Sequence, residues 1–171
     1  AVFTSFYIAL AASAQKNFKR MISYSSIFYM SLIMIGVFSD NPIGIKGAIF
    51  LAVSHGLIIS MMFIISGILQ EKTGSNNLNE LGGLASKMPY FALFFMISIL
   101  ATLGVPGFSN FIGELLIFLG AYFTYAFTLV AIGAILITTN YYLYATKSVL
   151  FSKLNKNFSS ITDINIADKL Q

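Results

Sequence analysis

The stretch that decides the fold reads LGVPGFSNFIGE and runs from Leu103 to Glu114. It lies inside an apolar segment, 88–146, in which Glu114 is the one charged residue. Proline removes a backbone donor and glycine permits unusual backbone angles, so the run 104–107 predicts a helix that stops and restarts. An ionised side chain in hydrocarbon costs at least ~2.5–3.5 kcal/mol. A lone acid beside a broken helix is therefore the main functional signal of the sequence.

The composition places this chain in a membrane. Of its 171 residues, 57% are hydrophobic and 9% are charged, whereas soluble domains carry about 25% charged residues. We therefore expect an all-α integral membrane protein. The chain has no cysteine and one histidine, which excludes disulfides and iron–sulfur ligation and leaves no credible metal site or bound cofactor.

A transmembrane helix needs about 20 apolar residues, and on this basis we expect five spans in one helical bundle over 1–151. The first is partial and the fourth is discontinuous. The expected ranges are about 1–14, 18–38, 45–69, 89–122 (broken at 104–107) and 125–151. Residues 152–171 read as an amphipathic polar tail at the membrane surface. Both ends read as cuts through a longer design, so we expect a fragment of a larger subunit.

Basic residues define the expected orientation. If the spans alternate, only Lys46 of the ten lysines and arginines falls on one face of the membrane, and the others fall on the opposite face. By the positive-inside rule, that basic face is the cytoplasmic or matrix side. The tail 152–171 is then expected on the same side.

Glu114 and His55 are the candidate proton carriers. Burial disfavours the charged form of a carboxylic acid and a nearby cation favours it, so a glutamate between these influences can take and release a proton. The alternative is a structural contact with a lysine or a lipid headgroup, but the mid-span position favours the relay. His55 lies near the centre of the third span, after Ser54. An imidazole has an ordinary pKa of about 6.5 and suits a proton shuttle, although a neutral histidine bonded to a neighbouring helix fits equally well.

The remaining candidates are polar groups within the spans. The break formed by Gly104, Pro106 and Gly107 fits either a hydrated cavity, as in transporters, or a plain proline kink. Lys19 opens the second span and is more readily an orientation anchor than a relay station. The hydroxyls of Ser54 and Tyr29 and the Asn140 amide can order water or form interhelical hydrogen bonds.

Several motifs resemble the antiporter-like membrane subunits of respiratory complex I. They are AQKNFKRMISYSS at 14–26, GAIF at 47–50 with SHGL at 54–57, LGGL at 81–84 with KMP at 87–89, and TLGVPG at 102–107 with NFIGE at 110–114. The resemblance covers nearly the whole chain, in order. A glutamate at 114, where sister subunits and antiporter relatives mostly have lysine, points to the subunit 4 type, called NuoM in bacteria.

The resemblance implies a fold built of two inverted repeats, of which this chain resembles the second. It implies that Glu114 matches the terminal relay acid, His55 the histidine of the central axis, Pro106 the helix break and Lys19 a conserved lysine. Tyr29 stands where the family usually has a histidine. A tyrosine orders water but does not ionise near neutral pH.

The function implied by this resemblance is proton translocation by a non-redox subunit of NADH:ubiquinone oxidoreductase. NADH, FMN, iron–sulfur clusters and ubiquinone are expected on other subunits. Expected partners are a chain that supplies the first repeat and the last helix, neighbouring antiporter-like subunits, and lipids such as cardiolipin, but no nucleic acid. The fragmentation and an AT-style composition favour the mitochondrial inner membrane over a bacterial plasma membrane.

Two alternatives stay open. One is a subunit of a related multi-subunit cation/proton antiporter, against which Glu114 argues. The other is a structural fragment with an inactive proton path, which Tyr29 and the apparent truncation keep open.

Overall fold

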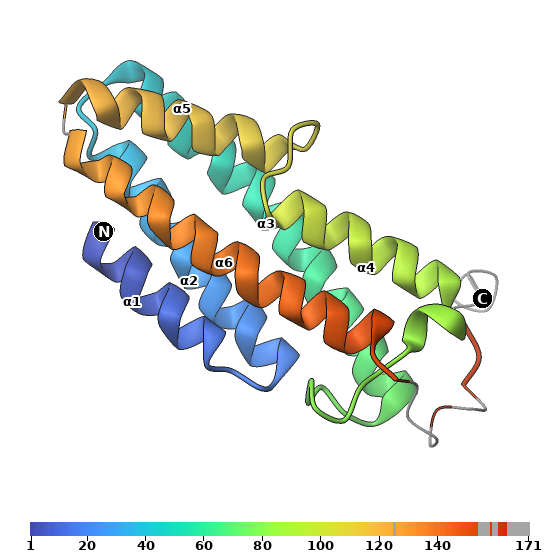
Figure 1. The fold of residues 1–171 in the computed structure, drawn as a ribbon. Coiled ribbons are helices and arrows are strands. Elements are labelled where there is room, and N and C mark those ends of the chain that lie inside the picture. The colour runs from blue at the N-terminus through green and yellow to red at the C-terminus, as the bar shows by residue number, and fades with distance from the viewer. Residues whose placement is uncertain (125, 154–157, 159–160, 164–171) are drawn as a thin grey trace.

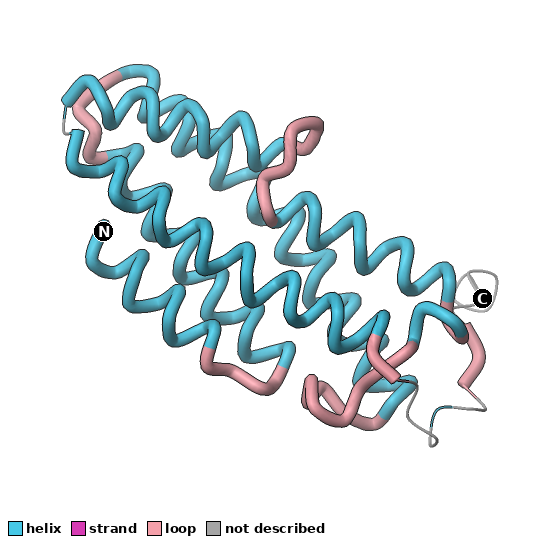
Figure 2. Tube along the Cα trace, viewed as in Figure 1, coloured by secondary structure: helices cyan, strands magenta, loops and turns pink. Residues whose placement is uncertain are grey.

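The computed structural model describes residues 1–124, 126–153, 158 and 161–163 as a bundle of helices (Figures 1 and 2). The α-helices are α1 (Val2–Ser13), α2 (Phe18–Val37), α3 (Pro42–Thr73), α4 (Pro89–Thr102), α5 (Ser109–Thr124) and α6 (Ala131–Thr146). The short helical turns are η1 (Leu84–Ser86), η2 (Ala126–Val130) and a π-helical turn, η3 (Lys147–Phe151). None of these elements is a strand, which confirms the all-α class for the described part of the chain.

Within the described residues, three helical stretches are long and apolar enough to cross a membrane by length and composition: 18–37, 42–73 and 128–151. The helices α1, α4 and α5 are apolar but shorter. In Figure 1, α4 and α5 follow one another along α3, and both contact α3. The two short helices therefore form the halves of one interrupted span.

The third helix is longer than the stretch 45–69 expected from hydrophobicity. The Asn41 side chain accepts a hydrogen bond from the backbone N–H of Ile43 at 2.8 Å, and Pro42 occupies the first turn. Both features favour a helix start. At the other end, Gly74 adopts a left-handed conformation with φ +74° and ends the helix. The expected start of the fifth span, Tyr125, lies outside the described residues.

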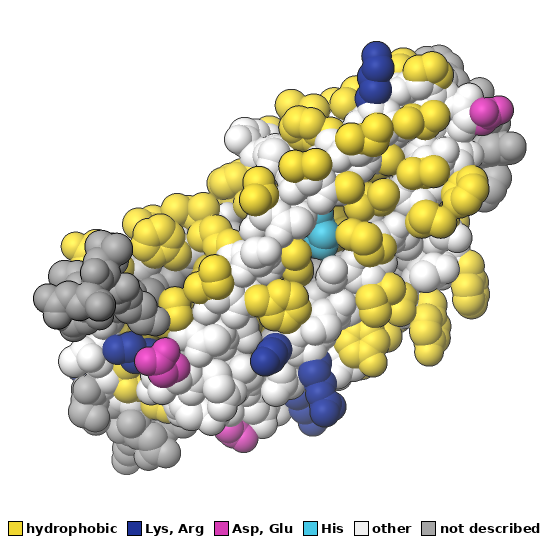
Figure 3. Space-filling view, turned by 180° about the vertical axis from the view of Figure 1, so that it is seen from behind, with side chains coloured by type: hydrophobic (Ala, Val, Ile, Leu, Met, Phe, Trp, Pro, Cys, Tyr) yellow, Lys and Arg dark blue, Asp and Glu magenta, His cyan; other side chains and the backbone are white. Residues whose placement is uncertain are grey.

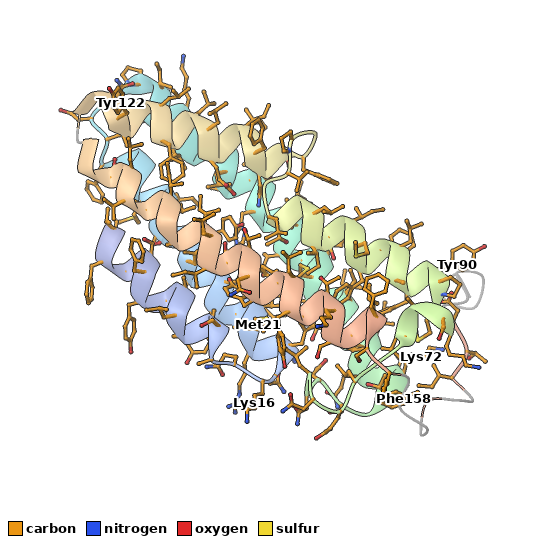
Figure 4. The ribbon with its side chains drawn as sticks, viewed as in Figure 1. Lys16, Met21, Lys72, Tyr90, Tyr122 and Phe158 are labelled. Atoms are coloured by element: carbon orange, nitrogen blue, oxygen red, sulfur yellow. The ribbon has the colours of Figure 1, made fainter. Side chains whose placement is uncertain are left out.

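Backbone hydrogen bonds join the loop between α1 and α2 to the loop that follows α3, at one end of the bundle. The N–H of Phe18 donates to the carbonyl of Asn76, and the N–H of Leu78 donates to the carbonyl of Lys16, each at 2.8 Å. Lys16 and Lys72 lie at this end and Tyr122 lies at the opposite end (Figure 4). Lysine and arginine side chains gather mainly toward one end of the face shown in Figure 3. The bundle therefore has one basic end.

Two described parts of the C-terminal tail pack on the basic end. Phe158 is 6% exposed and belongs to an apolar cluster with residues of the helices. The Asp163 carboxylate accepts hydrogen bonds from the N–H groups of Tyr90 at 2.7 Å and Phe91 at 3.2 Å. It thereby caps α4, whose own preceding residue, Met88, makes no capping bond. Other parts of the expected tail, 154–157, 159–160 and 164–171, lie outside the described residues.

The core consists of two apolar clusters stacked along the bundle. One contains Phe18, Met62 and Phe95 and lies toward the basic end, and the other contains Leu51 and Ile117. On α3 and α2 the transition between them falls at polar residues, namely Ser54, His55, Ser25 and Ser26. Polar groups therefore meet midway along the bundle, between two apolar layers.

Glycines allow α5 to lie directly against α3. A Cβ atom on Gly120 would approach the backbone nitrogen of Gly44 to 2.2 Å, and one on Gly113 would lie 2.8 Å from the Cβ of Leu51. Small residues permit such close approach of membrane helices, which is stabilised by van der Waals packing. Because Gly113 precedes Glu114, this contact also holds the acid close to α3.

This packing predicts unequal effects of two glycine substitutions. Gly120→Ala should force α5 away from α3 and lower the free energy of unfolding by about 1–3 kcal/mol, as overpacking does. Gly67→Ala is the matched control, since a Cβ there meets nothing within 4 Å. The thermal midpoint of the assembled protein in detergent measures both. Equal midpoints for the two variants would show that the glycine contact is not required.

Candidate functional site

The candidate site forms around the gap between α4 and α5. Helix α4 ends at Thr102. After it, Gly104 and Gly107 adopt φ values of +61° and +108°. These left-handed conformations are open to glycine and strained for other residues. In a continuous helix the carbonyl of residue 102 accepts from the N–H of residue 106, but Pro106 has no N–H. The sequence thus interrupts the helix at the point where the structure shows the gap.

Glu114 places its carboxylate against this gap. It lies in the second turn of α5 and is 8% exposed. A Cβ atom on Gly104 would lie 2.9 Å from each of its carboxylate oxygens. The buried Oε1 atom has no hydrogen-bond partner among the described residues. The acid therefore occupies the space that the absence of a side chain at Gly104 leaves open.

Ser54 and His55 form the part of the site contributed by α3. The Ser54 hydroxyl donates to Oδ1 of Asn110 at 2.6 Å and lies 2.5 Å from the hydroxyl of Ser109. His55 is 1% exposed, and its Nε2 atom lies 3.4 Å from the hydroxyl of Ser26 on α2. These contacts join α3 to the first turn of α5 and to α2.

Tyr29 joins α2 to both His55 and the gap. Its ring stacks on the His55 imidazole with a centroid distance of 4.5 Å and an interplanar angle of 24°. Its hydroxyl donates to the backbone carbonyl of Thr102, the last residue of α4. Tyr29 therefore contacts His55 with its ring and the end of α4, beside the gap, with its hydroxyl.

Three buried polar atoms of this region have no partner among the described residues: His55 Nδ1, Asn110 Nδ2 and Glu114 Oε1. Buried polar atoms are normally bonded to protein or to ordered water. Asn110 and Glu114 are four residues apart on α5 and so share one face of the helix. These groups retain hydrogen-bonding capacity close to the gap.

Lys19 and Asn140 lie away from this group. Lys19 is exposed at the basic end, where it lines a surface cavity of about 400 Å³ with Asn17, Ser66 and Asn76. It precedes Tyr29 by ten residues, or roughly 15 Å along the helix. Asn140 is exposed on α6 and lines a separate cavity of about 260 Å³. Neither residue is brought into contact with His55 or Glu114.

The structure also reveals polar groups that the sequence analysis did not select. The Tyr142 hydroxyl on α6 donates to the hydroxyl of Ser25 on α2 at 2.6 Å, and both residues are fully buried. The neighbouring Tyr141 hydroxyl is buried and has no partner among the described residues. The two adjacent tyrosines in the middle of the last span could have been selected from the sequence as candidate polar groups. The lack of a helical partner for the Thr102 carbonyl was also predictable, since Pro106 follows four residues later, but its bond to Tyr29 was not.

No metal centre is evident in the described part of the chain, where no group of three or more His, Cys, Asp or Glu side chains comes together. The site therefore consists of hydrogen-bonding groups and one lone acid beside an opened backbone. Such an arrangement can hold a proton or pass it on, because each group can donate, accept or change its protonation.

Comparison with known proteins identifies the family. A family profile described as "NADH:quinone oxidoreductase/Mrp antiporter, TM" matches residues 1–139. The chain belongs to this NADH:quinone oxidoreductase/Mrp antiporter family. The match includes the helix gap, Tyr29, His55 and Glu114, so the whole candidate site lies within the family region.

Individual relatives agree with this assignment. NADH-quinone oxidoreductase subunit M of Rickettsia felis is 42% identical over 160 residues, which cover 92% of this chain and 32% of that protein. F(420)H(2) dehydrogenase subunit M of Methanosarcina mazei is 39% identical over 163 residues, which cover 93% of this chain and 32% of that protein. The chain thus spans about a third of the length of these relatives.

A solved structure shows the same fold. The structure of respiratory complex I from Thermus thermophilus with bound NADH contains a chain that matches 98% of this antiporter-family chain, with a TM-score of 0.92 and 30% sequence identity. The match covers 36% of that chain. The interrupted helix therefore belongs to an arrangement seen in an assembled respiratory complex.

The contact between Gly104 and Glu114 predicts non-additive effects on stability. Gly104→Ala should be less damaging in a Glu114→Asp background, because the shorter acid withdraws from the new methyl group; groups in contact couple by about 0.5–3 kcal/mol. Gly107→Ala is the control, since it also places an alanine at a positive φ but its Cβ meets nothing within 4 Å. Thermal midpoints of the single and double variants measure the coupling. Additive effects at position 104 would contradict the contact.

Proposed function

We propose that this chain is part of a proton-translocating membrane subunit of a respiratory NADH:ubiquinone oxidoreductase of the subunit 4 type. It carries part of the proton path and no redox centre. The observation that supports this most is the Glu114 carboxyl, which is buried against the gap and has one oxygen without a hydrogen-bond partner in the described part of the chain. An intramembrane ionisable residue is by default a candidate for transport.

Glu114 serves as the proton station in this proposal. The backbone at 103–108 is not helical, and non-helical backbone at membrane depth is tolerated where protein or water surrounds it. The buried Oε1 atom of Glu114 has no partner among the described residues that would hold the acid in its charged form. A change of charge on a neighbouring group would therefore shift the balance between its neutral and ionised forms.

His55 is the preceding station. It lies on α3, and the hydrogen-bonded group Ser54, Ser109 and Asn110 connects this part of α3 to α5. The Nδ1 atom of His55 and the Nδ2 atom of Asn110, which have no partner in the part of the chain that the structure describes, can form hydrogen bonds with water molecules. Protons would pass from His55 through this polar group to Glu114, and leave along the gap.

Lys19 and Asn140 remain predictions. The exposed position of Lys19 at the basic end supports a role as an anchor or at the uptake side, rather than beside Glu114. Asn140 lines a separate surface cavity, where it would act through water.

Redox chemistry in this proposal belongs to other subunits, which would carry NADH, FMN, iron–sulfur clusters and ubiquinone. The partners would be neighbouring antiporter-like subunits of the membrane arm, and lipids such as cardiolipin. Large apolar side chains support such contacts, since Phe3, Leu57 and Leu136 are 83%, 73% and 69% exposed. Lipid or partner helices must cover surfaces of this kind.

The family and its apolar helices establish a multi-pass membrane protein. The mitochondrial inner membrane stays a prediction from the sequence, because the relatives reported above are bacterial and archaeal and do not favour it specifically.

A subunit of a multi-subunit cation/proton antiporter is the second candidate, because the matching family includes Mrp antiporters. The proton path proposed here would serve in either assembly. Copurification of this chain with redox subunits supports the respiratory complex, and a complex without them supports the antiporter. A purely structural role is the remaining alternative.

Glu114→Gln tests the proposal directly. It should abolish or strongly reduce proton translocation while the complex still assembles, because an amide of similar shape cannot exchange a proton. Glu71→Gln, at the exposed end of α3, is the control and should pump normally. The measurement is the number of protons moved per electron in sealed vesicles. An unchanged number of protons per electron in Glu114→Gln would rule out Glu114 as a proton station and would favour a purely structural role.

A further inference from the structure

At the end of α4 a backbone carbonyl lacks its helical hydrogen bond, and Tyr29 supplies a donor to it. The Thr102 carbonyl has no helical partner because Pro106 stands where that N–H would be. The neighbouring backbone N–H groups are already used, since Gly104 donates to Ala101 and Val105 donates to Leu100, each at 3.3 Å. A buried carbonyl without a partner is costly. The Tyr29 hydroxyl supplies the bond from another helix.

The side chain of Thr102 does not compete for this role. Its hydroxyl donates to the carbonyl of Ser98 at 2.7 Å, within α4. The backbone carbonyl is therefore the group through which the end of α4 is tied to α2. Thr102 is fully buried and Tyr29 is 2% exposed, so bulk water does not replace the phenol.

We propose that Tyr29 is a positioning residue: its hydroxyl latches the end of α4 to α2 and so fixes the gap relative to His55. The ring and the hydroxyl have separate tasks. The ring stacks on His55 and packs edge-on against Phe28 at a centroid distance of 5.3 Å. The hydroxyl alone reaches the gap.

The latch keeps its bond while protons move. A tyrosine hydroxyl does not ionise near neutral pH, in contrast to an acid or an imidazole that changes its charge. Gly104 lies two residues after the latched carbonyl and packs on the Glu114 carboxylate. Fixing Thr102 thereby fixes the wall against which Glu114 rests. The effect on proton transfer rests on the function proposed above, whereas the effect on the gap does not.

Tyr29→Phe in the assembled, membrane-embedded complex tests the latch, because it keeps the ring and removes the hydroxyl. The backbone amides of 103–105 and 107–109 should exchange with deuterium about fivefold faster, the factor expected for losing one net hydrogen bond. Tyr142→Phe is the control: it loses an equally buried bond, to Ser25, and should leave exchange at 103–109 unchanged. Proton translocation per electron should fall in Tyr29→Phe.

A rescue separates the hydrogen bond from packing. Para-aminophenylalanine at position 29 carries an N–H donor at the same place and should restore both slow exchange and translocation. Unchanged exchange at 103–109 in Tyr29→Phe, or no recovery with para-aminophenylalanine, would overturn the latch. If Tyr29→Phe loosens the gap while Glu114→Gln pumps normally, the latch stands and the proposed function fails.

Discussion

The missing N–H of Pro106 is the constraint on which the geometry of this protein depends. It prevents α4 from continuing and leaves the Thr102 carbonyl to be bonded from outside the helix. The chain then turns through Gly104 and Gly107 in conformations that favour glycine. The open space at Gly104 receives the Glu114 carboxylate. One absent donor thus creates both the gap and the setting of the acid.

The polar groups around the gap fall into two kinds. The hydroxyls of Tyr29 and Ser54 make bonds to neighbouring helices and define where the helices sit. His55, Asn110 and Glu114 each keep a buried atom without a partner among the described residues. Two apolar clusters lie on either side of this region along the bundle. Controlled proton transfer requires that the helices stay in place while the proton-carrying groups change their charge, because the distances between these groups must be kept.

Features that depend on local chemistry were predictable from the sequence. The helix gap followed from Gly104, Pro106 and Gly107, and the lone acid at 114 was visible against its apolar surroundings. Contacts between distant segments were not predictable. The Tyr29 hydroxyl and the Thr102 carbonyl are 73 residues apart, as are Asp163 and the Tyr90 N–H it caps. Lys19 and Asn140 were selected for polarity, but their sequence positions do not reveal which face of each helix meets the site.

Infrared difference spectroscopy of the assembled complex during turnover tests the central claim most directly. The claim is that the buried Glu114 carboxyl alternates between its neutral and ionised forms. If Glu114 changes its protonation, a protonated-carboxyl band rises and decays with turnover and is missing from the spectrum of the Glu114→Gln complex. A Glu114 band that stays constant throughout turnover would contradict the account, since a carboxyl locked in one state carries no protons.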